Sequence, residues 1–201
     1  MTKTVEFLFD LGSPYSYLAW YQLPKVAQAQ GARIVYTPVL LGGIFQATGN
    51  ASPAGVPAKA RYLDADLQRW AQAWGVPYSP NPAFPINTLA LMRGAVAMQM
   101  QGDEPFQRYM DAMYQAMFGQ PRNLGDPAEV AAVLTAAGFD AARFMAQIGD
   151  QAVKDKLKDN TTQAVARGVF GAPSFFVGDA LFWGQDRIDQ VGQALAGVML
   201  Q

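Results

Sequence analysis

At the start of the chain, two short apolar runs flank a segment with helical spacing, a pattern that predicts a β–α–β unit. The first expected strand is Thr4–Phe9 and the second is Ala32–Val39. Between them, apolar residues recur at helical intervals up to Gly31. Ser13 is the expected N-cap of this helix and Pro14 its first residue, since a proline there loses no hydrogen bond.

The middle of the chain is predicted to be helical, because apolar residues keep recurring at helical spacing. The expected helices begin at Pro57, Thr88, Asp103, Pro127, Ala141 and Gln151. Asp126 and Glu129 are expected to form a capping box at one of these helix starts. Near the end of the chain, Ser174–Val177 and Ala180–Trp183 are predicted to pair as a hairpin, and Asp186–Leu195 to form the last helix.

These elements indicate an α/β fold in which a βαβ half and a ββα half share one sheet. That arrangement is a thioredoxin-like fold with an inserted all-helical domain. The expected thioredoxin-like domain covers residues 1–56 plus 165–201, and the helical domain covers residues 57–164. A chain of 201 residues can bury a sizeable core without disulfide bonds.

Composition excludes several classes of function. Fifteen Lys and Arg residues oppose sixteen Asp and Glu residues, so neither nucleic acid nor an anionic membrane is an expected partner. The chain contains no cysteine and no histidine, which excludes disulfide exchange, catalysis by a Ser-His-Asp triad and histidine metal sites, and we expect no bound metal. Its chemistry must therefore use hydroxyl groups, backbone amides, carboxylates, lysines or a bound cofactor.

We expect a cytoplasmic protein. The first apolar run contains charged residues and is not typical of a secretory signal. The longest stretch without charge, Ile34–Ala58, contains several prolines and glycines and cannot form a membrane helix.

The corner between the first strand and the first helix is the expected binding site, because backbone N–H groups and the helix dipole point there. Ser13 and Ser16 have the spacing that two cysteines hold in thiol oxidoreductases. Two serines cannot form a disulfide, but a hydroxyl and a partly positive helix end can stabilise the thiolate of another molecule. The alternative is that Ser13 serves only as an N-cap.

Other candidate residues also have two interpretations. Pro173 suits a cis peptide bond that exposes the Ala172 backbone beside Ser13, or it only begins a strand. Asp186 is either a helix cap or a carboxylate that binds an ammonium group. Asn50 is either a turn residue or an amide ligand. Lys59 is either solvated or the partner of a carboxylate.

Several segments together resemble a known family. They are Phe7–Leu18 (FLFDLGSPYSYL), Thr48–Asn50 (TGN), Val169–Pro173 (VFGAP) and Trp183–Arg187 (WGQDR). The chain is similar over nearly its whole length to the 2-hydroxychromene-2-carboxylate isomerases and the kappa-class glutathione transferases. These enzymes form a branch of the DsbA-like thioredoxin-fold superfamily.

The resemblance implies that glutathione is the cofactor and that the protein is a homodimer. Ser13 matches the catalytic serine that hydrogen-bonds the glutathione sulfur. Gln185 and Asp186 match positions that hold the γ-glutamyl end, and Asn50 and Lys59 match positions near the glycyl end or the substrate. The implied cofactor-binding set is Ser13, Asn50, Lys59, Ala172, Pro173, Trp183, Gly184, Gln185 and Asp186.

The resemblance also implies a small aromatic or electrophilic substrate, and the leading hypothesis is an isomerase of aromatic compound degradation. In the isomerases, basic residues follow the second strand and precede the third helix. This chain has Phe45 and Phe84 at those places, which is closer to the kappa-class pattern, and both are expected to contact the substrate. A kappa-like glutathione transferase is the enzymatic alternative. The non-enzymatic alternative is a DsbA-like peptide-binding module without redox activity.

Overall fold

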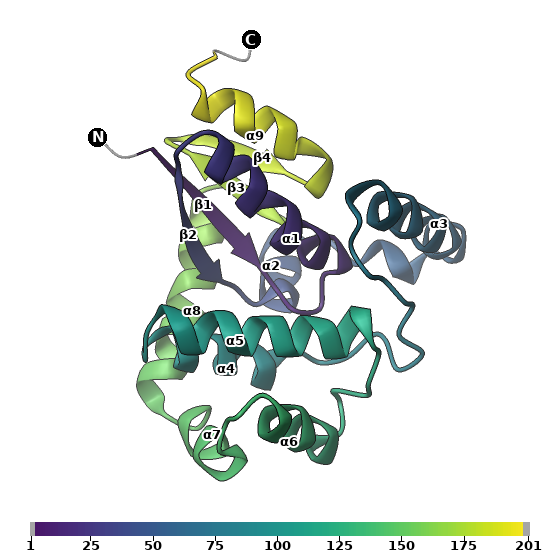
Figure 1. Ribbon diagram of the computed structural model, residues 1–201, viewed down its shortest axis with the longest axis vertical. Helices are drawn as coiled ribbons and strands as arrows, with labels where there is room; N and C mark the ends of the chain where they lie inside the picture. The colour runs from purple at the N-terminus through teal and green to yellow at the C-terminus, as the bar shows by residue number, and fades with distance from the viewer. Residues whose placement is uncertain (1–2, 199–201) are drawn as a thin grey trace.

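The computed structural model describes residues 3–198, and its centre is a four-stranded mixed sheet (Figure 1). The strand order is β2-β1-β3-β4, with β1 (Thr4–Phe9) parallel to β2 (Arg33–Pro38) and antiparallel to β3 (Ser174–Val177). β4 (Ala180–Trp183) completes a hairpin with β3. The predicted thioredoxin-like fold and all four strands are confirmed.

Helices cover both faces of the sheet, and β1 shows why. Phe7 of β1 is fully buried in the cluster that includes α1 (Pro14–Ala29) and α9 (Ile188–Leu195). Its neighbour Leu8 belongs to a second buried cluster, with residues of α2 (Leu41–Thr48) and α8 (Gln151–Ala166). Because successive strand residues point to opposite faces, one mostly apolar strand supports both layers.

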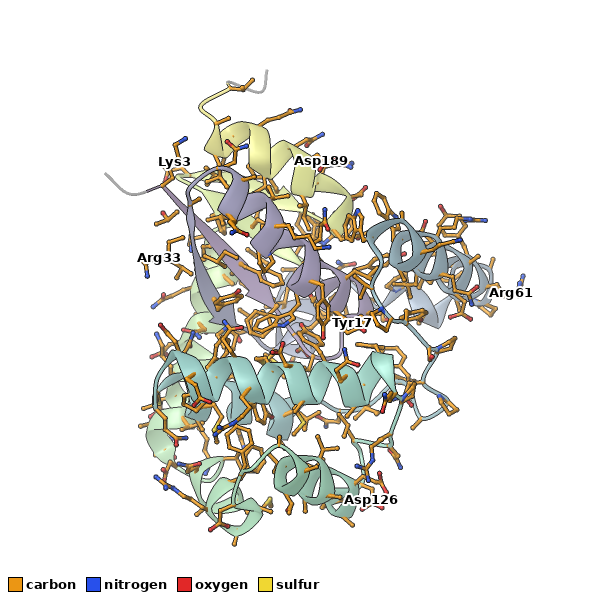
Figure 2. The ribbon with its side chains drawn as sticks, viewed as in Figure 1. Lys3, Tyr17, Arg33, Arg61, Asp126 and Asp189 are labelled. Atoms are coloured by element: carbon orange, nitrogen blue, oxygen red, sulfur yellow. The ribbon has the colours of Figure 1, made fainter. Side chains whose placement is uncertain are left out.

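The remaining helices lie between α2 and α8 in the chain. They are α3 (Pro57–Trp74), α4 (Leu89–Gln99), α5 (Asp103–Tyr114), α6 (Pro127–Ala136) and α7 (Ala141–Gln147), with the short segments η1 (Pro53–Gly55) and η2 (Gln115–Gly119). α4 and α5 pack together below the sheet in Figure 1, whereas α3 stands apart at one side. Tyr17 of α1 is fully buried where α1 faces α5, with its ring 5.7 Å from that of Tyr114 (Figure 2).

Helix α2 is absent from the sequence-based prediction, and its contacts explain why. Its N-cap residue Leu40 provides no side-chain hydrogen bond, and glycines occupy its first turn. The first N–H groups instead donate to distant side chains: Leu40 N–H to Thr161 Oγ1 at 2.9 Å and Leu41 N–H to Asp10 Oδ2 at 2.7 Å. The helix start is therefore satisfied by tertiary contacts that no local pattern reveals.

Of the two hydrogen bonds in the predicted capping box at α6, the one from Asp126 is present and the one from Glu129 is absent. Asp126 caps the helix as expected, because its Oδ1 accepts the Ala128 N–H at 2.8 Å. Glu129, however, binds Arg122 Nε at 2.6 Å, and the Asp126 N–H donates to Asn123 O. A nearby cation holds Glu129 more strongly than a neutral backbone N–H does.

Within the described residues, none of the helices is both long enough and apolar enough to span a membrane.

Two helical glycines give a test of the packing. A Cβ on Gly94 in α4 would collide with the Tyr109 hydroxyl and come 2.5 Å from Phe144 Cε2, whereas a Cβ on Gly42 in α2 meets nothing. We expect Gly94→Ala to lower the free energy of unfolding by about 1–3 kcal/mol. Gly42→Ala should raise it by up to about 1 kcal/mol, because alanine favours helix. Urea denaturation measures both, and equal effects would contradict the packing described for α4.

Candidate active site

Ser13 occupies the corner between β1 and α1. It is the N-cap of α1, and its Oγ accepts the Ser16 N–H at 3.1 Å. The same oxygen donates to the Ala172 carbonyl oxygen at 3.0 Å, across 159 residues of sequence. Both interpretations of Ser13 are thus compatible: the residue caps the helix and faces the loop before β3.

The loop before β3 has the predicted cis peptide bond between Ala172 and Pro173. Gly171 allows the close approach of the Trp183 indole, because a Cβ there would lie 2.6 Å from Trp183 Nε1. The Gly184 N–H donates to Pro173 O at 3.0 Å, which ties the loop to the end of β4. No hydrogen bond joins the Ala172 N–H to another group in residues 3–198. The Ala172 backbone is therefore available to an extended ligand beside Ser13.

The segment after β4 begins at Trp183, half of whose surface is exposed and whose ring lies 4.9 Å from that of Phe170. Gly184 has a φ of 102°, a left-handed conformation that suits glycine. Gln185 is buried and Asp186 is exposed. Both lie in the short helix η3 (Gln185–Arg187), which precedes α9.

The expectation that Asp186 caps the last helix is wrong. It lies inside η3, and its Oδ2 accepts a bond from Arg187 Nη1 at 2.7 Å. Gly184 is the N-cap residue of η3, and Arg187 is the N-cap residue of the last helix, α9. The Asp186 carboxylate is thus at the surface beside the cis-proline loop.

The structure brings Asn50 to the same loop. Its Nδ2 donates to Phe170 O at 2.8 Å, and its Oδ1 accepts the Ala51 N–H at 2.8 Å. Lys59 lies exposed in the first turn of α3, and no hydrogen bond or ion pair engages it within residues 3–198. Phe45 is half-buried on α2, and it is not among the residues that line the cavity described next.

A cavity of about 360 Å³ begins at Pro14, directly after Ser13. Its walls come from α3, η1, η2 and the bend that follows α3. The lining residues are Pro14, Ala54, Ala60, Leu63, Asp64, Leu67, Tyr78, Pro80, Asn81, Phe84, Pro85 and Phe118. The cavity thus places the predicted substrate residue Phe84 near the Ser13 corner, in a mostly apolar and aromatic space.

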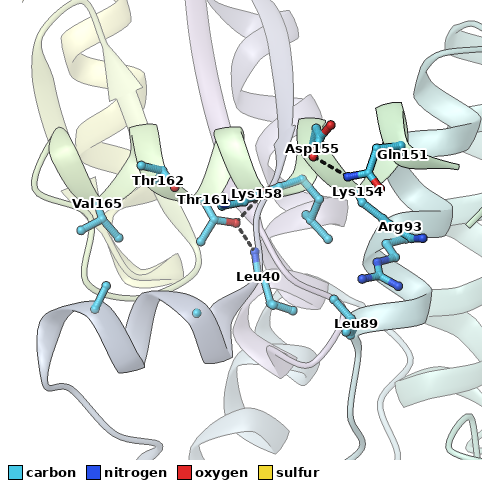
Figure 3. Close-up of a pocket in the computed structure, with 13 residues that line it drawn as sticks. Leu40, Leu89, Arg93, Gln151, Lys154, Asp155, Lys158, Thr161, Thr162 and Val165 are labelled. Carbon is cyan, nitrogen blue, oxygen red and sulfur yellow. Dashed lines mark hydrogen bonds between the residues drawn. The ribbon is translucent and has the colours of Figure 1, made fainter. Parts of the chain in front are cut away.

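A larger cavity of about 510 Å³ lies between α2, α4 and α8 (Figure 3). Leu40, Leu89 and Val165 give it apolar walls, and Arg93 and Lys154 are also among its lining residues. It shares no lining residue with the cavity at Pro14. The smaller cavity is therefore the one adjoining the candidate site.

Sequence reasoning missed Asp10, which lies under the Ser13 turn. Its carboxylate is fully buried and accepts bonds from Gly12 N–H at 2.7 Å, Thr88 Oγ1 at 2.8 Å and Leu41 N–H at 2.7 Å. Burial raises the pKa of this carboxyl above its ordinary value, and the three hydrogen bonds act in the opposite direction. A charged residue at the end of an apolar strand was the signal in the sequence that could have identified it.

These groups suit the binding of a thiolate. The dipole of α1 and the Ser13 hydroxyl favour a negative charge at this corner. In the described part of the chain, no cluster of metal-ligating side chains is present.

Comparison with known proteins agrees with this geometry. The family model for a DSBA-like thioredoxin domain matches residues 4–196. The 2-hydroxychromene-2-carboxylate isomerase of Sphingobium xenophagum is 35% identical, over 94% of this chain and 96% of the relative. Glutathione S-transferase kappa 1 of Caenorhabditis elegans is 28% identical, over 95% of this chain and 90% of the relative.

A solved structure of a 2-hydroxychromene-2-carboxylate isomerase superposes with a TM-score of 0.85 at 31% identity, and the match covers 97% of this chain and 95% of that one. The relatives that match this chain over nearly its whole length are therefore enzymes. The chain belongs to the DSBA-like thioredoxin-domain family and, within it, to the enzymes that include the 2-hydroxychromene-2-carboxylate isomerases and the kappa-class glutathione transferases.

Proposed function

We propose that the chain is a glutathione-dependent isomerase that acts by the reaction type of its 2-hydroxychromene-2-carboxylate isomerase relatives. The observation that carries the proposal is the position of Ser13 Oγ, at the start of α1 and 3.0 Å from Ala172 O. A chain without cysteine cannot provide its own thiol at this corner. A thiol at this corner would have to come from another molecule.

The residues present fit glutathione. The Ala172 backbone could pair with an extended tripeptide as an added strand does at a sheet edge. Asp186 and Gln185 would hold the γ-glutamyl ammonium end, with Trp183 and Gly184 beside them. Lys59 and Asn50 would face the glycyl carboxylate. Each end of the tripeptide would thus meet a group of suitable charge or polarity.

Ser13 would act on the sulfur by changing its hydrogen-bond partner. Its hydroxyl has one proton, which in this structure is donated to Ala172 O. With a sulfur in reach, the proton would be donated to it, and Ala172 O would be free to accept an N–H from the tripeptide. A free thiol with a pKa of about 8.5 is mostly protonated at neutral pH. The added donor and the helix end would favour the thiolate.

Bound glutathione would supply a thiolate that adds reversibly to a conjugated carbon, so that rotation can occur about the former double bond. The chain's own residues would hold the reactants in place. The apolar cavity beside Pro14 would exclude water from the substrate.

A kappa-like transferase is the second candidate. The observation in its favour is the aromatic lining of the cavity, with Phe84 and Phe118 and without a lysine or arginine among the lining residues. Such a cavity suits uncharged electrophiles. The cytoplasmic location and the homodimer stay predictions from the family resemblance.

We expect Ser13→Ala to bind glutathione but to lower turnover roughly ten- to hundredfold, because a hydrogen bond to a charged group is worth about 1.5–3 kcal/mol. The pKa of the bound thiol, followed by ultraviolet absorbance of the thiolate, should rise in the variant. Asp126→Ala removes a helix cap far from the site and controls for the loss of stability. Unchanged turnover and thiol pKa in Ser13→Ala would contradict the role of Ser13.

We expect Asp186→Ala to weaken glutathione binding by up to about fivefold, the usual size of an exposed ion pair, with little change in turnover at saturation. Thermal shift against glutathione concentration measures the affinity. Asp189→Ala is the matched control, since Asp189 is an exposed carboxylate three residues further along the chain. Equal affinities for both variants would refute the assignment of Asp186 to the γ-glutamyl end.

The isomerase and the transferase differ in what happens to the thiol. We expect isomerisation of 2-hydroxychromene-2-carboxylate or its methyl ester to go to completion with sub-stoichiometric glutathione and with free thiol conserved. Absorbance spectra and a thiol assay measure both quantities. Absence of isomerisation, together with rapid thiol loss to a chlorodinitrobenzene, would show a transferase instead.

A further inference from the structure

The lining of the cavity beside Ser13 suits an aromatic ring. The Phe84 and Phe118 rings lie 6.1 Å apart, and the Tyr78 ring is stacked on Phe118 at 6.4 Å with an angle of 28°. Leu63 and Leu67 of α3 add aliphatic surface to the lining. Aromatic and aliphatic linings of this kind bind apolar rings and leave orientation to a few polar groups.

The cavity carries a negative charge, whereas an anionic substrate requires a positive one. Asp64 is the charged residue among the lining residues, and no lysine or arginine accompanies it there. Lys59 lies close by, one residue before the lining residue Ala60, but the proposed function assigns it to the glycyl carboxylate of glutathione. A substrate carboxylate would therefore enter beside a like charge without a cation of its own.

Tyr78 provides the hydrogen-bond donor of this cavity. Asn81, the lining amide, is already engaged, because its Nδ2 donates to Met117 O and Arg122 O, each at 3.0 Å. The Tyr78 hydroxyl makes no hydrogen bond within residues 3–198. It is accessible to solvent, so a ligand can reach it. Burial, together with the charge of Asp64, raises the pKa of Tyr78 to about 12. The phenol therefore stays protonated throughout the neutral range.

We propose that this cavity binds an uncharged aromatic carbonyl compound and that the Tyr78 O–H donates a hydrogen bond to its carbonyl oxygen. The proposal rests on the function proposed above and narrows its substrate class, since the isomerase relatives are named for a carboxylate. A hydrogen bond to the carbonyl oxygen withdraws electron density from the conjugated carbon. Tyr78 thus both orients the substrate and makes it more electrophilic.

The first test measures binding without turnover, using coumarin and coumarin-3-carboxylate as a neutral and an anionic probe. We expect calorimetry to show tighter binding of coumarin, by roughly fivefold for one like charge near the probe. Asp64→Asn should strengthen the binding of coumarin-3-carboxylate and leave the affinity for coumarin unchanged. Asp179→Asn, in the exposed turn between β3 and β4, should change neither probe's affinity. Equal or tighter binding of the carboxylate by the unmodified protein would overturn the proposed substrate class.

The second test removes the Tyr78 hydroxyl. Tyr78→Phe keeps the ring that stacks on Phe118, so packing is preserved. We expect coumarin to bind roughly two- to tenfold more weakly, and kcat for the methyl ester of 2-hydroxychromene-2-carboxylate to fall while the KM for glutathione stays unchanged. Unaltered coumarin affinity and kcat would refute the role of Tyr78.

The two tests also separate this proposal from the proposed function. If coumarin is preferred and Asp64→Asn and Tyr78→Phe act as expected on coumarin binding, the substrate class is supported even when neither the ester nor the acid is isomerised in the presence of glutathione. That second result would refute the isomerase and leave the cavity assignment intact. If the ester is isomerised more slowly than the acid and Tyr78→Phe has no effect, the isomerase is supported and the substrate class is wrong.

Discussion

The buried carboxylate of Asp10 joins the Ser13 turn to the starts of α2 and α4. Its Oδ1 accepts from Gly12 in the Ser13 turn and from Thr88 at the start of α4, and its Oδ2 accepts from Leu41 at the start of α2. A buried carboxylate that lost these donors would cost several kcal/mol. The Ser13 turn, the start of α2 and the start of α4 are therefore held in fixed positions relative to one another.

This constraint fixes the position of the Ser13 hydroxyl. The Ser13 N–H donates to Asp10 O at 3.0 Å, so the turn is tied at both its side chain and its backbone. A Cβ on Gly12 would lie 3.1 Å from Thr88 Cγ2, so glycine allows the close approach of α4. The Leu11 N–H meets Met92 Sδ at 3.2 Å. A hydroxyl held this firmly needs little rearrangement to meet a ligand, which is the basis of electrostatic preorganisation.

The sheet and α1 could be predicted from the sequence because their signals are local: short apolar runs, and Ser13 followed by Pro14. The start of α2 could not, since its N–H groups bind side chains 31 and 121 residues away. The same distinction applies to the site. The contact between Ser13 and the cis-proline loop follows from the thioredoxin-like fold. The family resemblance predicts that fold as well. Tyr78 and Asp64 belong to no motif, and only the folded chain shows that they line one cavity.

The two sides of the site are therefore built under different constraints. The side proposed for glutathione comes mostly from turns beside the sheet, such as the loop before β3 with Gly171 and Pro173, and Lys59 of α3 is the exception. The side proposed for the substrate comes largely from α3 and the bend after it. α3 stands apart from the sheet and buries only Leu67 and Ala71 (Figure 1). Exposed side chains on that helix can change without loss of the core, so the charge of the cavity can change while the Ser13 corner stays the same.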